Sequence, residues 1–149
     1  MKSNRLPHIE ISQSFITMDG QFLMQLRDFK PSIVFPGCWG FFAGHMETGE
    51  SAEETILREL QEELCWQPSS LIYLGSLEVE GNRRIHVHQC QLDGDLESLS
   101  LQEGQEIGTF TLEEIIRGSL FSQKWKQYYL ITPTSEKVFH HFILKGIHV

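Results

Sequence analysis

The sequence predicts an α/β domain in which a mixed sheet is covered by helices on both faces. Paired strand-like segments meet at glycine-containing turns, and one long segment has helical periodicity. The chain has 149 residues, of which 40% are apolar, and it contains no low-complexity tract. Strands mixed with two or three helices in a chain of this size favour a layered sheet. We therefore expect a single domain over residues 1–149 with its own apolar core.

The first two strands are predicted from alternation around a turn signal. Residues 9–17 and 21–29 flank Asp19-Gly20, a dipeptide that favours a tight hairpin. One face of the second strand is apolar and carries Phe22, Met24 and Leu26. Arg27 lies on the opposite face of that strand.

The segment from residue 35 to 44 is rich in glycine and aromatic residues. This composition suits a loop and a short strand whose backbone comes close to a ligand. Backbone carbonyls in such a segment can complete an oxygen shell around a cation.

A helix is predicted immediately after this segment. Ser51 followed three residues later by Glu54 forms a capping box, which marks a helix start. The helix has one apolar stripe, made of Ala52, Ile56, Leu57, Leu60 and Leu64. Glu59, Glu62 and Glu63 stand at positions i, i+3 and i+4, so they share another face.

Negative charge is concentrated on and beside this helix. The stretch from Glu47 to Glu63 carries seven glutamates against one arginine and so supplies six of the eight net negative charges. Like charges at this spacing cost a helix roughly 0.2–0.5 kcal/mol per pair. A bound multivalent cation would turn that cost into a gain, so the pattern indicates a metal site.

The remaining elements follow from shorter patterns. Residues 71–79 and 83–92 predict a second hairpin about Gly81-Asn82. The rest of the chain predicts a strand over 106–111, helices over 112–117 and 122–130, and a last strand or extended tail over 138–144. Glu103 precedes Gly104 in the loop before the strand at 106. A glycine there lets the chain turn a carboxylate toward a pocket, although an ordinary polar turn is the alternative.

The spacing around the acidic helix resembles the Nudix box. Gly44 is followed by five residues, Glu50, seven residues and then Arg58-Glu59-Leu60-Gln61-Glu62-Glu63-Leu64-Cys65-Trp66. Two of the 23 positions depart from the signature, because Cys65 replaces the usual glycine and Trp66 an aliphatic residue. Neither departure affects a carboxylate. Cys65 raises only the question of how the helix ends, since glycine there normally takes the left-handed conformation.

The resemblance implies an α/β/α sandwich and a metal-dependent hydrolase. Its substrate class is a nucleoside diphosphate linked to another moiety, as in a nucleoside polyphosphate or a nucleotide sugar, and its cofactor is Mg²⁺ or Mn²⁺. By this resemblance the metal ligands are Glu59, Glu62, Glu63 and a backbone carbonyl of Ala43 or Gly44. Glu50 would pair with Arg58 in a structural role.

The resemblance leaves the general base open between Glu59 and Glu103. It also suggests that Arg27 reaches the substrate, with a solvated strand residue as the alternative. His86 and His88 share one strand face. They are candidates for lining a substrate pocket, while surface positions and zinc binding are the other interpretations.

Charge and cysteine content exclude several other classes. A net charge of −8 and a pI near 5.3 argue against a nucleic-acid partner, because phosphate-binding surfaces are basic. Three cysteines without metal-ligand spacing favour a reducing cytoplasm. No run of about 18 apolar residues predicts a membrane span. Monomer and homodimer both remain open, although proteins with this box are often dimers.

A second function is a non-catalytic nucleotide-binding or regulatory module with the same fold. Only Cys65 and Trp66 favour it, since the box carboxylates are all present. The substrate itself is not specified, because the box defines the reaction type while the loops choose the leaving group.

Overall fold

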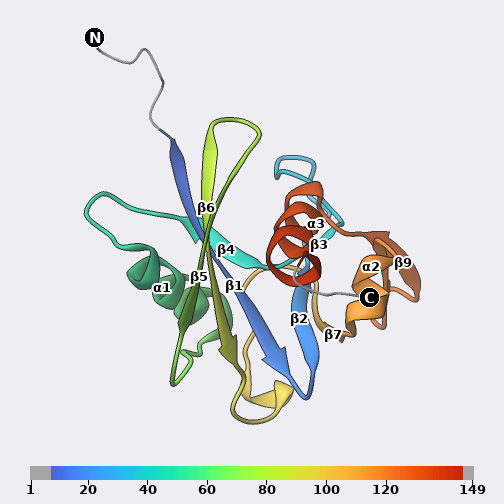
Figure 1. Ribbon diagram of the computed structural model, residues 1–149. Helices are drawn as coiled ribbons and strands as arrows, with labels where there is room; N and C mark the ends of the chain where they lie inside the picture. Colours follow the sequence, from blue (N-terminus) through green and yellow to red (C-terminus); the bar gives the residue numbers. More distant parts are fainter. Residues whose placement is uncertain (1–7, 146–149) are drawn as a thin grey trace.

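A mixed seven-stranded sheet lies between helices in the computed structural model, which describes residues 8–145. The sheet order is β3-β2-β1-β6-β5, with β4 paired to β1 and β7 paired to β2. Its strands are β1 (Ile9–Met18), β2 (Gln21–Leu26), β3 (Trp39–Gly40), β4 (Phe42–His45), β5 (Ile72–Val79), β6 (Arg83–Gln91) and β7 (Glu106–Phe110). Figure 1 shows α1 (Ala52–Leu64) and α3 (Pro133–Phe139) on opposite sides of this sheet.

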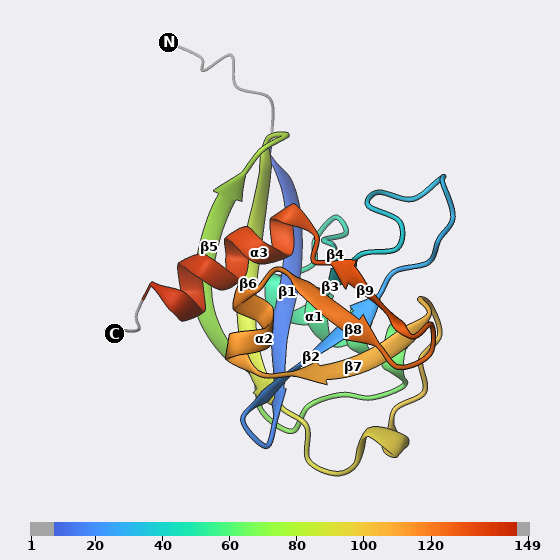
Figure 2. The ribbon, with the colours of Figure 1, turned by 90° about the vertical axis from the view of Figure 1, so that its right-hand side faces the viewer.

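Strand β1 is the centre of the sheet because three strands pair with it. It runs parallel to β6 along its length and antiparallel to β2 through its last residues. Its first half pairs instead with β4, which places Gln13 beside Ala43 on one side and beside Val87 on the other. The long connection between β2 and β3 projects from the sheet, as Figure 2 shows. Val34 and Phe35 of this loop line a cavity together with residues of β1 and β4.

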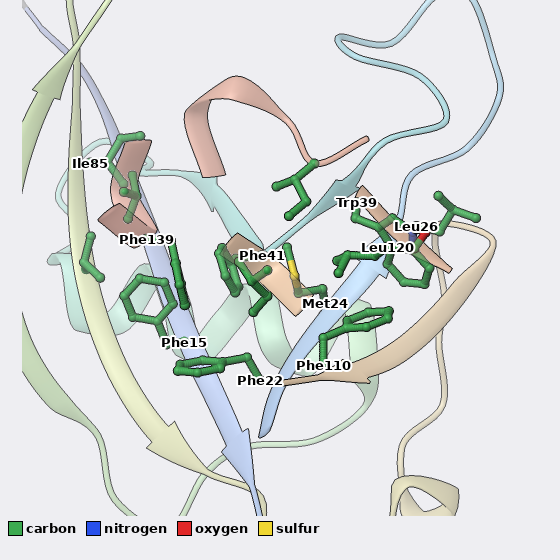
Figure 3. Packing of buried hydrophobic residues seen from close by; sticks show 14 of the residues in the cluster. Phe15, Phe22, Met24, Leu26, Trp39, Phe41, Ile85, Phe110, Leu120 and Phe139 are labelled. Carbon is green, nitrogen blue, oxygen red and sulfur yellow. Dashed lines mark hydrogen bonds between the residues drawn. The ribbon is translucent and has the colours of Figure 1, made fainter. Parts of the chain in front are cut away.

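Each face of the sheet has its own apolar core. Helix α1 buries Ile56, Leu60 and Leu64 against residues of β1, β2 and β4. The opposite core packs α3 and a hairpin of β8 (Ser119–Ser122) and β9 (Gln127–Leu130) on the sheet. Its aromatic rings meet mostly edge to face (Figure 3). Its members include Phe15, Phe22, Met24, Leu26, Trp39, Phe41, Phe110 and Phe139. The predicted two-sided sheet and the apolar face of β2 are thereby confirmed.

The predicted acidic helix begins and ends where its caps require. Ser51 caps α1 and forms the reciprocal capping box with Glu54. Cys65 ends the helix in the left-handed conformation, with φ of 53°, and its N–H donates to the carbonyl of Gln61. Cysteine thus adopts the conformation that glycine normally supplies, at some cost in backbone strain.

Two sequence predictions in the last third of the chain are wrong. Residues 122–130 do not form a helix, because Ser119–Ser122 (β8) and Gln127–Leu130 (β9) form a separate hairpin. The turn between these strands places Lys126 in the left-handed region, with φ of 58°. Residues 138–144 are not a strand or extended tail, because they belong to α3 and to a π-helix over His140–Leu144.

The helix α2 (Leu112–Ile116) confirms the prediction over 112–117. A short 3₁₀ turn spans Leu96–Ser98.

Between residues 8 and 145, no helix combines the length and the apolarity that crossing a lipid bilayer requires.

Candidate active site

Arg58 ties the acidic helix to the loop before it. Its Nε and Nη2 donate to the two carboxylate oxygens of Glu50, at 2.7 and 2.9 Å. Nη2 also donates to the carbonyl of His45 at 3.1 Å. The guanidinium of Arg58, with hydrogen bonds from the Glu47 N–H and the Thr55 hydroxyl, lowers the pKa of Glu50 to about 2. The geometry agrees with a structural role for Glu50 and Arg58.

Glu59 lies against the backbone of Gly44. A Cβ built on Gly44 would stand 2.1 Å from the Glu59 carboxyl carbon, so only glycine leaves room for this side chain. Glu59 is 15% exposed, and Arg58 Nη1 donates to its Oε1 at 2.9 Å. Burial raises the pKa of Glu59, the charge of Arg58 opposes this, and Glu62 and Glu103 raise it further. The carboxylate is therefore held beside the strand that carries Ala43 and Gly44.

Glu63 is the most strongly perturbed carboxyl of the helix. Burial, together with the negative charges of Glu59 and Glu103, raises the pKa of Glu63 to about 8. Its Oε2 is buried and has no hydrogen-bond partner among the described residues. A buried carboxyl oxygen without a donor is costly, and a bound cation would satisfy it. Glu62 is different, because its side chain is 58% exposed.

The loop that carries Glu103 is fixed close to these carboxyls. The Gln102 N–H donates to the carbonyl of Glu63 at 2.8 Å, which joins the loop to the end of α1. Gly104 has φ of 89°, and a Cβ there would lie 2.9 Å from the carbonyl oxygen of Leu26. Glycine is thus required for this turn. Glu103 itself is exposed, and its charge acts on both Glu59 and Glu63.

Two neighbours of Glu103 hold the loop in place. Asp28 accepts hydrogen bonds from the Gln105 side chain at 2.6 Å and from the Gly104 N–H at 3.4 Å. Glu106 accepts from the Ser122 hydroxyl at 2.5 Å and from the Gln123 N–H at 3.0 Å, so its carboxylate supports the β8–β9 turn. Asp28 was not predicted from the sequence. It follows Arg27 directly and belongs to no recognised motif.

Two cavities meet at Arg27. The larger, of about 360 Å³, lies between β1, β4 and the start of α3 and is lined by Gln13, Gly40, Phe41, Gly44 and Arg83 among others. The smaller, of about 300 Å³, is lined by Glu103, Gly104, Asp28 and Lys30 among others. Arg27 lines both cavities, and its Nε donates to the carbonyl of Val34 at 2.9 Å. Its charge also opposes the pKa rise of Glu63.

The oxygen atoms of these residues are suitable ligands for a hard cation, although they do not form a complete coordination shell. In the part of the chain that the structure describes, no three His, Cys, Asp or Glu side chains form a group that could hold a metal ion. The unpaired oxygen of Glu63 and the Gly44 backbone under Glu59 nevertheless supply the donor type that Mg²⁺ prefers. Mg²⁺ usually keeps several waters and shares its shell with substrate phosphates, so an incomplete protein shell is expected.

His86 and His88 lie outside both cavities. The Nε2 of His86 is 2.6 Å from a Glu10 carboxylate oxygen, and its Nδ1 is 3.0 Å from the Tyr73 hydroxyl. His88 is buried, with its Nδ1 3.2 Å from the carbonyl of Gln13. These partners are structural, and substrate binding by the two histidines stays a prediction.

Gln13 is the second residue that sequence reasoning missed. It stands in β1 between Ile11 and Phe15, which are apolar residues of the same strand face. The sequence signal for Gln13 was a polar residue at a core-facing position of a strand. Such a residue either has hydrogen-bond partners inside the core or contacts a ligand.

Gly44→Ala is expected to weaken metal binding by about tenfold or more, because altering the support of a metal ligand commonly costs about 10–100-fold in metal affinity or activity. The added methyl would displace the Glu59 carboxyl from the β4 backbone. Mn²⁺ titration followed by electron paramagnetic resonance measures the affinity. Gly40→Ala is the matched control, because a Cβ there meets nothing closer than 3.5 Å. Equal Mn²⁺ affinity in Gly44→Ala and the unaltered protein would contradict the placement of Glu59.

Comparison with known proteins places this arrangement in a family. The NUDIX domain model matches residues 11–132. The chain is 29% identical over 110 residues to a CTP pyrophosphohydrolase of Escherichia coli (strain K12), covering 73% of this chain and 80% of that protein. It is 29% identical over 123 residues to the mitochondrial NAD(P)H pyrophosphatase NUDT13 of Mus musculus, covering 76% of this chain but only 35% of that protein.

A solved structure shows the same fold. The crystal structure of a MutT protein from Methanosarcina mazei Go1 superimposes with a TM-score of 0.72 at 20% identity, covering 98% of this chain and 100% of that one. The mixed sheet between helices is therefore shared over nearly the whole chain.

Proposed function

Because this chain belongs to the Nudix family of pyrophosphohydrolases, we propose that it hydrolyses a phosphoanhydride bond in a nucleoside diphosphate linked to another moiety. The proposed substrate types are nucleoside polyphosphates and nucleotide sugars. The observation that carries the proposal is that Glu59 packs on Gly44, which lines the larger cavity, while Glu103, whose charge acts on Glu59 and Glu63, lines the smaller one. Partly buried carboxyls with raised pKa values, such as Glu59 and Glu63, are typical of a functional site.

Glu59 and Glu63 would hold the divalent cation, with Glu62 at the exposed side and a carbonyl of Ala43 or Gly44 completing the protein's share. Bound Mg²⁺ or Mn²⁺ neutralises phosphate charge and makes water more acidic. Arg58 keeps Glu59 in place from the other side through its 2.9 Å hydrogen bond. Arg27, between the two cavities, is placed to bind substrate phosphate oxygens.

Glu103 is the better of the two candidates for the general base. Glu59 is held by Arg58, packed on Gly44 and proposed as a metal ligand, so its carboxylate is less free to meet the attacking water. Glu103 lies on a glycine-anchored loop, is exposed, and lines the smaller cavity beside Arg27. It would take the proton from the attacking water, which is the usual contribution of a positioned carboxylate. Glu106 cannot serve, because its oxygens are occupied by the β8–β9 turn.

A small-molecule substrate agrees with the charge of the chain. A net charge of −8 disfavours a nucleic-acid backbone, whereas one nucleotide needs only a local cation and Arg27. Cys38, Cys65 and Cys90 are free thiols, which is compatible with the reducing cytoplasm that we propose as the location.

We expect phosphate or nucleoside monophosphate release from at least one nucleotide in the presence of Mg²⁺ or Mn²⁺. The assay panel comprises nucleoside triphosphates, nucleotide sugars and dinucleotides, and product release is followed by chromatography. Removing the metal with a chelator should abolish turnover, and adding Mg²⁺ back should restore it. Tight nucleotide binding without product release from any substrate would instead favour a non-catalytic module.

A further inference from the structure

Phe35 is an exposed aromatic residue in a strained backbone conformation beside the larger cavity. It is 40% exposed and lines that cavity. Its φ of 49° lies in the left-handed region, which bulky side chains rarely adopt. Between residues 8 and 145 it belongs to neither apolar core, and its ring meets no other aromatic ring. Contacts within the fold therefore do not explain a strained phenylalanine here, whereas strained residues are typical of ligand sites.

The segment that carries Phe35 is anchored on both sides. On one side, the carbonyl of Val34 accepts a hydrogen bond from the Nε of Arg27 at 2.9 Å. On the other, the N–H of Gly37 donates to the carbonyl of Asp28 at 3.0 Å, which joins the two ends of the loop. Phe35 is thus held beside the cavity before any ligand binds, and a preformed contact loses little conformational entropy on binding.

The larger cavity receives apolar side chains from the sheet and from the loop. Ile11 and Ile85 line it from β1 and β6, while Val34 and Phe35 line it from the β2–β3 connection. Its volume of about 360 Å³ lies within the usual range of roughly 300–1,000 Å³ for small-molecule sites. A flat apolar group bound here would gain most from an aromatic ring against its face.

The same cavity reaches the proposed cation site. Gly44 lines the cavity, and Glu59 packs directly on Gly44. Arg27 also lines the cavity and extends to the smaller one. A nucleotide with its base at Phe35 would therefore have its phosphates on the side of Glu59 and Arg27.

We propose that Phe35 binds the substrate by stacking on its nucleobase. Stacking on an aromatic side chain tolerates all bases, because every base has a π-face. Phe35 therefore contributes affinity for a nucleotide without choosing the base. A sugar has no π-face, so in a nucleotide sugar the base rather than the sugar would occupy the larger cavity. The proposal rests on the proposed function in that it takes a nucleotide as the substrate.

Binding of nucleoside monophosphates tests the role of Phe35. Calorimetry with the full-length protein and Mg²⁺ compares adenosine, guanosine, cytidine and uridine monophosphates, and the tightest binder is used for the variants. Phe35→Ala should bind it about tenfold more weakly or worse, as loss of a base–aromatic stack commonly does. Phe35→Tyr keeps the aromatic face and should stay within about threefold of the unaltered protein.

Nuclear magnetic resonance of the bound nucleotide gives a second measurement. Base protons that lie over an aromatic ring shift upfield because of its ring current. The shift should be present with the unaltered protein and with Phe35→Tyr, and it should shrink in Phe35→Ala. A purely structural role of Phe35 would not produce this pattern.

Phe29→Ala is the matched control. Phe29 is also 40% exposed and lies in the same connection between β2 and β3, but it lines neither cavity. Its ring contacts Trp125 and Tyr129 instead. Phe29→Ala should therefore keep the monophosphate affinity within about threefold, since it removes an aromatic ring outside the proposed base site.

Phe35→Asn guards against a folding defect. Asparagine adopts the left-handed conformation more readily than other non-glycine residues, so this variant should keep the loop while losing the ring. It should melt within a few degrees of the unaltered protein and show the same loss of affinity as Phe35→Ala.

An affinity of Phe35→Ala within threefold of the unaltered protein would overturn the proposal. Equal losses in Phe35→Ala and Phe35→Tyr, or in Phe35→Ala and Phe29→Ala, would also overturn it, as would absence of binding of all four monophosphates at millimolar concentration. Monophosphates contain no phosphoanhydride, so these results do not depend on hydrolysis. Failure of every nucleotide in the turnover panel would reject the proposed function while stacking is still measured.

Discussion

Glu63→Gln is expected to lower turnover by about two orders of magnitude or more, because it removes an anionic oxygen ligand from the proposed cation site. Glutamine has nearly the same shape, so the helix and its apolar stripe should be retained. Steady-state kinetics with saturating Mg²⁺ and the best nucleotide of the panel gives kcat and KM. Turnover within about threefold of the unaltered enzyme would contradict the role of Glu63.

The same substitution should stabilise the metal-free protein. The pKa of Glu63 is about 8 in the folded protein, compared with 4.5 for an ordinary glutamate. The folded state therefore retains a proton that the unfolded chain releases, and stability falls as the pH rises from about 4.5 to 8. A glutamine side chain at this position has no such titration. We expect the variant to gain roughly 1–3 kcal/mol at pH 8, and the gain to vanish near pH 4.

Thermal melting in chelator at pH 4, 6 and 8 measures this effect. Glu62→Gln is the matched control, because Glu62 is 58% exposed and lies one position earlier on the same helix. Its melting temperature should differ from that of the unaltered protein by little, as for most surface substitutions. A Glu63→Gln variant that is less stable than the unaltered protein at pH 8 would show that the carboxyl is not buried without a partner.

Glu103→Gln is expected to lower kcat by about 100-fold while changing KM and Mg²⁺ affinity little, as loss of a general base commonly does. Its side chain is exposed and makes no described hydrogen bond, so stability should stay nearly unchanged. Steady-state kinetics with Mg²⁺ titration tests both points.

Glu106→Gln provides the control at the start of β7, next to the same loop. Glu106 accepts hydrogen bonds from Ser122, Gln123 and Lys124, so the variant should lose about 1 kcal/mol of stability and keep most of its kcat. If Glu103→Gln changes kcat little while Glu59→Gln lowers kcat alone by a large factor, Glu59 rather than Glu103 would be the general base.

Local signals predicted the parts of the fold that local chemistry controls. The hairpin at Asp19-Gly20, the hairpin at Gly81-Asn82 and the helix capped by Ser51 all formed where their turn and cap residues stand. Turn glycines and capping side chains act within four residues, so their pattern can be read directly. Arg58 also pairs with Glu50, as the resemblance to the Nudix box implied.

The last third of the chain was misread because its local signals conflict. Trp125, Tyr128 and Tyr129 have helical spacing, yet the hairpin forms around Lys126, which gives no glycine turn signal. Thr132 and Pro133 are a helix-start signal for α3, but the apolar residues after it also fit a strand. Packing against the sheet decided both cases, because Val138 and Phe139 complete one core.

Residues close together in the chain specify the acidic helix and its register, and the resemblance of this segment to the Nudix box indicated the reaction class. Tertiary structure alone decided which groups meet at the site. Glu103 approaches Glu63 only because Gln102 binds the end of α1, and Gln13 faces a cavity only because β1 pairs with both β4 and β6. Burial is the largest cause of the raised pKa of Glu63, and it arises, like the repulsion from Glu103, from neighbours distant in sequence, which no local pattern contains.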